Sequence, residues 1–146
     1  MKKFGLIGFP LSHSFSKAYF TAKFEKLGLS NYSYELYELK DIALLSELIQ
    51  TENLSGFNVT IPHKINILPF INNLNKDALE AGAVNCVKVE NVKGKLILNG
   101  YNTDVYGFTE SLSPLLKPEY KKALILGNGG ASKAVQVALK NLDIPY

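Results

Sequence analysis

Hydrophobic and polar positions change their spacing several times along the chain, and these changes predict an ordered series of strands and helices. Alternating or short continuous apolar runs are typical of strands, whereas apolar residues at every third or fourth position indicate helices. We expect strands at residues 4–8, 32–39, 55–59 and 123–126, and a hairpin formed by residues 83–90 and 95–99. We expect helices at residues 14–27, 41–49, 65–71, 76–81, 103–116 and 129–142.

Local features sharpen three of these expectations. Apolar side chains recur at helical spacing in the first helix, which Gly28 should end; they are Phe15, Tyr19, Phe20, Phe24 and Leu27. Asp41 can cap the second helix by accepting a hydrogen bond from its first turn. The run at residues 123–126 is short and wholly apolar, so we expect a buried strand there.

The alternation of strands and helices predicts an α/β fold with a largely parallel sheet flanked by helices. The helix at residues 103–116 would connect two sheets, so we divide the chain at that point. Residues 1–101 form an α/β domain, and residues 102–146 form the connecting helix and the first β-α unit of an incomplete Rossmann-like domain. Since a nucleotide-binding half needs at least a βαβ unit, we expect this chain to be the front part of a longer protein.

Composition and charge exclude several classes of protein. Apolar residues make up 47% of the chain and charged residues 20%, which is typical of a folded protein rather than a disordered one. The net charge of +3 is mild and no dense Lys/Arg cluster occurs, so we expect no nucleic-acid partner. No segment is long enough to span a membrane, and Cys86 is the only cysteine, which excludes an intramolecular disulfide. We therefore expect a cytoplasmic protein without a membrane partner.

Polar side chains gather at four places where an expected strand ends or an expected helix begins. The four segments are residues 8–16, 58–64, 82–85 and 102–104. Ligands of open parallel sheets bind beyond the carboxyl ends of the strands, so these segments favour one shared binding site. Each also has an ordinary explanation: Ser14, Ser16 and Asp104 can cap helices, and Lys64 alone can be a solvated amine. This ordinary explanation has to hold four times over, which weakens it.

A glycine-rich turn leads into the last helix and is a candidate phosphate cradle. It consists of Gly127, Asn128, Gly129, Gly130 and Ala131. Gly127 and Gly129 match the first two glycines of the dinucleotide-binding fingerprint, but the third position is not glycine. Glycines admit close approach of a phosphate, and a helix N-terminus offers free N–H groups. A tight strand-to-helix turn without a ligand is the alternative, and the residue that selects NAD or NADP would lie beyond this chain.

Together these segments resemble the shikimate dehydrogenase family. The matching motifs are Gly8-x-Pro10-x-x-His13-Ser14-x-Ser16, Asn58-Val59-Thr60-x-Pro62-x-Lys64, Gly82-Ala83-Val84-Asn85, Asn102-Thr103-Asp104-x-x-Gly107-Phe108 and Gly127-x-Gly129-Gly130-Ala131. They occur in the order of the family and span nearly the whole chain. The departures are Lys17, Phe20 and Thr21, where the family usually has a proline and a His-Asn pair, and Cys86, where threonine is commoner. They bear on local packing rather than on the chemistry.

The resemblance implies a substrate-binding domain at residues 1–101 and the start of an NADP-binding domain at residues 102–146. It implies the reversible, NADP-dependent reduction of 3-dehydroshikimate to shikimate, a step of aromatic amino-acid biosynthesis. Lys64 would be the catalytic acid and base, paired with Asp104. The substrate would be contacted by Ser14, Ser16, Thr60, Asn85 and Asp104. The five residues of the glycine-rich turn, residues 127–131, would hold the cofactor diphosphate.

These residue types suit that chemistry. A secondary alcohol gives up a hydride only as its hydroxyl proton leaves, so a base is needed at that oxygen, and an acid in the reverse direction. Serine and threonine hydroxyls and the asparagine amide can donate and accept, which suits a polyol acid. We also expect Asn58 to tie its loop through side-chain hydrogen bonds, and His63 to face away from the chemistry because neighbours in an extended segment point to opposite faces.

Three alternatives stay open at this point. The enzyme could be a quinate/shikimate dehydrogenase with relaxed choice of substrate or cofactor. The chain alone could be a catalytically incompetent substrate-binding fragment, which is why we expect these 146 residues by themselves to be inactive. A regulatory Rossmann-like protein would not need Lys64. The oligomeric state is also open, with a homodimer as one option.

Overall fold

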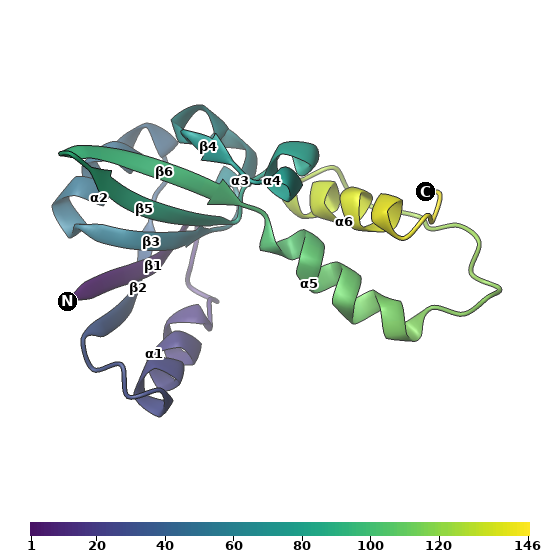
Figure 1. Ribbon diagram of the computed structural model, residues 1–146, viewed down its shortest axis with the longest axis horizontal. Coiled ribbons are helices and arrows are strands. Elements are labelled where there is room, and N and C mark those ends of the chain that lie inside the picture. The colour runs from purple at the N-terminus through teal and green to yellow at the C-terminus, as the bar shows by residue number, and fades with distance from the viewer.

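A six-stranded mixed sheet forms the centre of the computed structural model, which describes residues 1–146 (Figure 1). Its strands are β1 (Lys2–Gly8), β2 (Tyr32–Glu38), β3 (Leu54–Val59), β4 (Asn73–Leu74), β5 (Cys86–Val92) and β6 (Lys95–Tyr101). They lie in the order β2-β1-β3-β5-β6-β4. β1 is parallel to β2 and β3, and β4 is parallel to β6, whereas β5 is antiparallel to both of its neighbours. The predicted α/β class with helices flanking the sheet is confirmed, and the predicted hairpin is β5–β6.

Six α-helices connect and flank the strands. They are α1 (Ser16–Lys26), α2 (Leu45–Glu52), α3 (His63–Asn66), α4 (Lys76–Ala81), α5 (Thr103–Leu112) and α6 (Gly130–Asn141). Short 3₁₀ turns precede α2 and follow α3 and α5. The Asp41 carboxylate accepts the Ala43 N–H at 2.9 Å in the turn before α2, so the expected cap is present. None of the helices is both long and apolar enough to cross a membrane.

The main core lies on the face of the sheet that is covered by α2 and by the 3₁₀ turn after α3. Alternation along the strands turns Ile7, Val59 and Val87 toward this face, where they pack with Leu45 and Ile49 of α2. The opposite face carries a smaller cluster that includes Leu6 and Tyr34, against which α1 packs. The two clusters therefore fix the sheet between helical layers, and they leave the carboxyl ends of β1 and β3 side by side.

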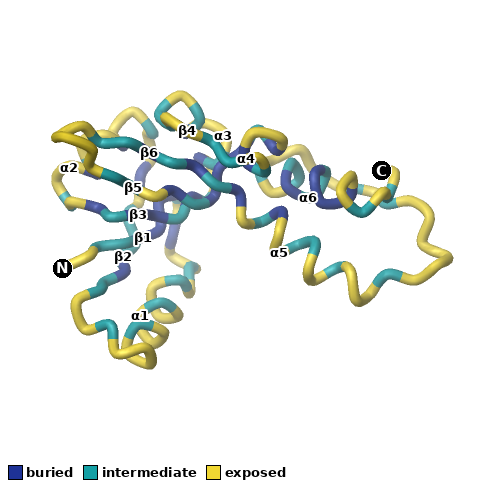
Figure 2. The backbone as a smooth tube through the Cα atoms, in the orientation of Figure 1, coloured by how far each residue is buried: buried dark blue, intermediate teal, exposed yellow.

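α1 is a helix without a buried residue. It contacts the sheet through Phe20 and Phe24, whereas Phe15 and Tyr19 are exposed, and its trace in Figure 2 carries no buried stretch. The periodicity of the sequence thus predicted the helix correctly, but only part of its apolar face meets the sheet.

α5 and α6 extend from the sheet as a packed pair (Figure 1). Their contact is built from small and branched residues, among them Val105, Ala134 and Ala138, together with Ala81 at the end of α4. Small side chains allow the helix backbones to approach closely. α6 therefore lies against both α4 and α5.

The predicted buried strand at residues 123–126 is wrong. These residues form no strand, and the side chains of Leu124 and Leu126 are exposed. A strand is stabilised by a ladder of bonds to its neighbours, and here the Ala123 N–H makes a single such bond, to the Pro145 carbonyl at 2.8 Å. The apolar pattern was present, but this segment has no paired strand to cover it.

Candidate active site

The ammonium of Lys64 and the carboxylate of Asp104 form an ion pair. Nζ of Lys64 donates to Oδ2 of Asp104 at 2.7 Å, although the two residues are 40 positions apart in the sequence. Lys64 lies in α3, which follows β3, and Asp104 lies in the first turn of α5, which follows β6. The Lys64 side chain is only 16% exposed, so the amine is largely withdrawn from water. The structure therefore brings together the two residues that the sequence analysis paired.

Asn85 holds the Asp104 carboxylate from its other oxygen. Its Nδ2 donates to Oδ1 of Asp104 at 2.7 Å and to the hydroxyl of Thr103 at 2.9 Å. Its Oδ1 accepts the backbone N–H of Thr103 at 2.8 Å. Each carboxylate oxygen thus accepts one hydrogen bond, which orients Oδ2 toward Lys64. Sequence reasoning did not single out Thr103 as a site residue, although it lies inside the quoted motif at residues 102–104.

The start of α5 is fixed by a buried cap. The side chain of Asn102 accepts the backbone N–H groups of Asp104 at 3.1 Å and Val105 at 3.3 Å. Its Nδ2 donates to the Ala83 carbonyl at 2.9 Å. Asn102 is 1% exposed, so this double role is shielded from water. The cap joins the turn after α4 to the residue that presents the carboxylate.

Side-chain hydrogen bonds also hold β3 and the start of α3. Oδ1 of Asn58, inside β3, accepts the Tyr34 hydroxyl of β2 at 2.8 Å. The side chain of Asn58 therefore ties two strands, whereas we expected it to tie the loop. The ring of His63 is buried, and its Nε2 donates to the Leu39 carbonyl at 2.5 Å. His63 is therefore engaged away from the ion pair, as expected, but His63 and Lys64 both lie in the helix α3 and not in the extended segment from which we argued.

A cavity of about 460 Å³ lies between this segment and the glycine-rich turn. Its wall includes Thr60 and Lys64 on one side and Gly129, Gly130 and Ala131 on the other. The candidate acid/base, one candidate substrate-binding residue and the candidate phosphate cradle therefore share one cavity. A small polar molecule bound at Thr60 would lie within the same space as a group held by the glycine-rich turn.

Ser14 and Ser16 lie nearby but outside the hydrogen-bonded cluster. The Ser14 hydroxyl accepts the Ser16 N–H at 3.3 Å, close to the start of α1. The end of β1 adjoins the segment after β3, because the Phe9 N–H donates to the Ile61 carbonyl at 2.9 Å. Neither serine hydrogen-bonds Lys64, Asp104 or Asn85. The structure thus places both serines between the end of β1 and the start of α1, without a hydrogen bond to the ion pair.

The glycine-rich turn fits a phosphate group. Gly127 has φ 118°, a conformation that a residue with a side chain rarely adopts. Gly129 caps α6 and has no side chain that could satisfy the N–H groups of the first turn. No atom lies within 4 Å of the place where a Cβ of Gly129 would be, so its backbone is open to a ligand. The free N–H groups and the positive end of the helix dipole favour an anion at this point.

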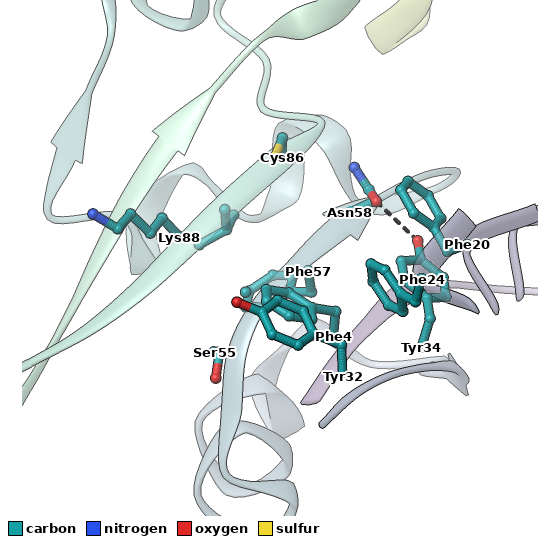
Figure 3. A pocket seen from close by; sticks show the side chains of 12 residues that line it. Phe4, Phe20, Phe24, Tyr32, Tyr34, Ser55, Phe57, Asn58, Cys86 and Lys88 are labelled. Carbon is teal, nitrogen blue, oxygen red and sulfur yellow. Dashed lines mark hydrogen bonds between the residues drawn. The ribbon is translucent and has the colours of Figure 1, made fainter. Parts of the chain in front are cut away.

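A second cavity of about 340 Å³ lies between α1 and the sheet, on the side away from α2 (Figure 3). Aromatic rings line it, and Phe20 stacks on Tyr34 with ring centroids 4.4 Å apart. Burial raises the pKa of the Cys86 thiol, which also lines this cavity and stays protonated near neutral pH. Phe20 and Cys86 are two of the positions that depart from the family pattern. Phe20 and Cys86 line this second cavity together with Asn58. They do not line the cavity that contains Lys64.

Known proteins similar to this chain are shikimate dehydrogenases. The family model described as shikimate dehydrogenase substrate binding domain matches residues 6–87. The NADP(+) shikimate dehydrogenases of Staphylococcus aureus strains MRSA252 and JH9 are 43% identical over 147 residues, which cover 98% of this chain and 53% of each relative. The chain thus spans about half the length of these curated relatives.

Solved structures agree with the sequence comparison. Shikimate dehydrogenase 1 of Peptoclostridium difficile is 34% identical, with a TM-score of 0.85 over 97% of this chain and 52% of that chain. The Thermus thermophilus enzyme in complex with NADP(H) and shikimate is 36% identical, with a TM-score of 0.82 over 99% of this chain and 54% of that chain. Since the family model covers more than half of its residues, this chain belongs to the shikimate dehydrogenase substrate-binding domain family.

Proposed function

We propose that this chain supplies the substrate site, and the start of the cofactor site, of a cytoplasmic NADP-dependent shikimate dehydrogenase. The reaction is the reversible reduction of 3-dehydroshikimate to shikimate in the shikimate pathway. The observation that carries the proposal is the Lys64–Asp104 ion pair at 2.7 Å, whose lysine lines a cavity together with the glycine-rich turn. The relatives named NADP(+) shikimate dehydrogenase and the structure with NADP(H) and shikimate support this choice of substrate and cofactor.

Lys64 is the proton donor and acceptor in this proposal. In the reducing direction its ammonium gives a proton to the substrate oxygen as that carbonyl becomes a hydroxyl, and in the oxidising direction the neutral amine takes the proton back. Asp104 orients the amine, and Asn85 fixes the carboxylate by donating to its second oxygen. The bound nicotinamide supplies or accepts the hydride, and the protein residues supply position and the proton.

The remaining polar residues are assigned to recognition. Thr60 lines the cavity beside Lys64 and would contact a substrate hydroxyl. Ser14 and Ser16, at the adjoining edge of the sheet, would contact the hydroxyls or the carboxylate from the side of α1, while Asn85 and Asp104 would bind from the side of α5. A site of this kind rejects analogues that leave its polar groups unpaired.

The glycine-rich turn is assigned to the NADP diphosphate, which its backbone N–H groups would bind.

We accordingly propose a substrate-binding domain at residues 1–101, and a connecting helix with the start of a Rossmann-like domain at residues 102–146. The partners in this proposal are small molecules, not nucleic acid or a membrane, and light scattering decides whether the protein forms a homodimer. The chain alone is expected to be inactive. Residues 123–126 lead into the glycine-rich turn but form no strand, so no sheet fixes the turn that would bind the cofactor.

The proposal is tested with Lys64→Met in the complete protein. We expect turnover of shikimate with NADP to fall by about 10²-fold or more, which is the usual contribution of a positioned acid or base, while calorimetry still detects shikimate binding. Lys88→Met is the matched control because Lys88 forms an exposed ion pair with Glu90, and it should leave turnover unchanged. Unchanged turnover in Lys64→Met would remove the mechanism. Assays with quinate and with NAD distinguish the enzyme of relaxed specificity.

A further inference from the structure

The first turn of α6 rests directly on the side chain of Lys64. A Cβ placed on Gly130 would lie 2.7 Å from the Cβ of Lys64, 3.3 Å from its Cδ and 3.5 Å from its Cγ. Carbon atoms in contact are normally about 3.5–4.0 Å apart, so a methyl group does not fit there without movement. The closest atom is the Lys64 Cβ, next to the backbone, and it cannot swing aside as the end of the side chain can.

A side chain is disfavoured at the three glycines of the turn for different physical reasons. Gly127 adopts a positive φ of 118°, and the backbone of Gly129 borders open space. Gly130 has neither property: its φ is not in the positive range, and its missing side chain leaves room for Lys64. Phosphate binding therefore explains Gly127 and Gly129 better than it explains Gly130.

α6 packs on Lys64 and on α5, the helix that carries Asp104. Its first residue packs on the stem of Lys64, and its next turns pack against α5 through Ala134, Ala138 and Val105. α5 carries Asp104 one residue before Val105. The backbone of Lys64 is held as well, because the Val84 N–H donates to the Lys64 carbonyl at 2.7 Å. A shift of the first turn of α6 would therefore change the distance between the ammonium and the carboxylate.

We propose that Gly130 is a positioning residue for Lys64, in addition to any contact with the cofactor. The close contact that glycine permits lets α6 hold the Lys64 stem, and this contact sets the ammonium on Asp104. The inference rests on the proposed role of Lys64 for its catalytic meaning. It further implies that displacement of the glycine-rich turn moves the acid/base, because both belong to one packed unit.

A double-mutant cycle on this chain tests the contact without any assay of activity. Gly130→Ala should lower the urea midpoint of unfolding, and most of this loss should disappear when Lys64→Gly removes the opposing side chain. We expect a coupling of about fivefold or more in the folding equilibrium constant, as is usual for residues in contact. Gly129→Ala is the matched control: it adds the same methyl group to the same turn, and it should show no coupling with Lys64→Gly.

Absence of coupling between Gly130→Ala and Lys64→Gly would overturn the inference. If Gly130→Ala alone does not fold, a folded double variant supports the inference and an unfolded double variant overturns it. The cycle is independent of the proposed function, so its failure is distinguishable from intact turnover in Lys64→Met.

A kinetic readout separates positioning from cofactor binding in the complete protein. Gly130→Ala should lower kcat at saturating NADP, because the acid/base is displaced, whereas Gly129→Ala should act mainly on the KM for NADP. A crystal structure of Gly130→Ala should show the Lys64–Asp104 pair lengthened from 2.7 Å. An unchanged kcat and an unchanged pair would contradict the positioning role.

Discussion

Asn102 holds Asp104 in place through the backbone: its side-chain oxygen accepts the Asp104 N–H at 3.1 Å. The carboxylate of the candidate site is thus presented by the first turn of a capped helix. The same asparagine donates to Ala83, two residues before Asn85, which hydrogen-bonds the Asp104 carboxylate. One buried amide therefore connects the backbone on both sides of the site, and the geometry of the ion pair depends on it.

We expect Asn102→Ala to lower the free energy of unfolding by about 2–3 kcal/mol. The substitution removes the cap of α5 and leaves the buried Ala83 carbonyl without its donor, and the two losses act together. Asp41→Ala is the control, because Asp41 caps an exposed 3₁₀ turn and its loss should cost only about 0.5–1 kcal/mol. Urea denaturation measures both, and equal losses would show that the buried bond to Ala83 has no effect.

Asp104→Asn should lower turnover in the complete protein by roughly 10²-fold, because a displaced catalytic group commonly has an effect of that size. The amide keeps the shape of the side chain but no longer attracts the Lys64 ammonium. The stability effect should be small, about 1 kcal/mol, since the pair is partly exposed.

Glu80→Gln provides the control for Asp104→Asn. Glu80 pairs with Lys140 at the surface and makes no hydrogen bond to Lys64, Asp104 or Asn85, so neither turnover nor stability should change measurably. If Asp104→Asn behaves like Glu80→Gln in steady-state kinetics, the orienting role of the carboxylate is wrong.

Most of the fold could be predicted from the sequence because periodicity reports which residues can share a face. It predicted the helix at Lys76–Ala81 to the residue and the strands β1, β2 and β3 within two residues. The helix predicted at residues 65–71 is instead α3 at His63–Asn66 and a separate 3₁₀ turn at Leu68–Phe70, so the prediction left Lys64 outside the helix. It missed β4 because two residues show no pattern. It could not show that Leu124 and Leu126 are exposed, since a buried strand also depends on neighbours that lie elsewhere in the chain.

In the candidate site as well, the sequence predicted the residue types but not the contacts between them. Residue types and the family resemblance selected Lys64 and Asp104, but their contact across 40 positions arises because β3 and β6 end at the same edge of the sheet, on either side of β5. The bonds that Thr103 makes to Asn85 and the contact of Gly130 with Lys64 have no sequence pattern of their own. Such contacts appear only when the packing of separate elements is known.

Tyr37 should make the protein less stable at alkaline pH. Burial, together with the nearby Glu52 carboxylate, raises the pKa of Tyr37 to about 12. The folded protein therefore keeps this proton while the unfolded chain loses it from about pH 10, so the stabilisation is complete below about pH 10 and is lost as the pH rises toward about 12. Burial raises the pKa of Tyr34 as well, which adds to the loss in the same direction.

Tyr37→Phe should reduce the fall of the urea midpoint between about pH 9 and about pH 11, because phenylalanine has no proton to lose. Tyr106→Phe is the control, since Tyr106 is an exposed tyrosine of α5 and the full pH dependence should persist. The same slope in Tyr37→Phe and in the unchanged protein would mean that Tyr37 titrates alike in the folded and unfolded states.

Two glycines should respond in opposite directions to alanine. A Cβ on Gly100 would lie 2.9 Å from methyl groups of both Ile71 and Val84, so Gly100→Ala overfills the core beside β6 and should cost about 1–3 kcal/mol. Gly107 lies inside α5 with no atom within 4 Å of its Cβ position, so Gly107→Ala should stabilise the protein by about 0.5–1 kcal/mol through reduced freedom of the unfolded chain. Urea denaturation of the two variants decides, because a loss in both would mean that α5 packs more tightly around Gly107 than the structure indicates.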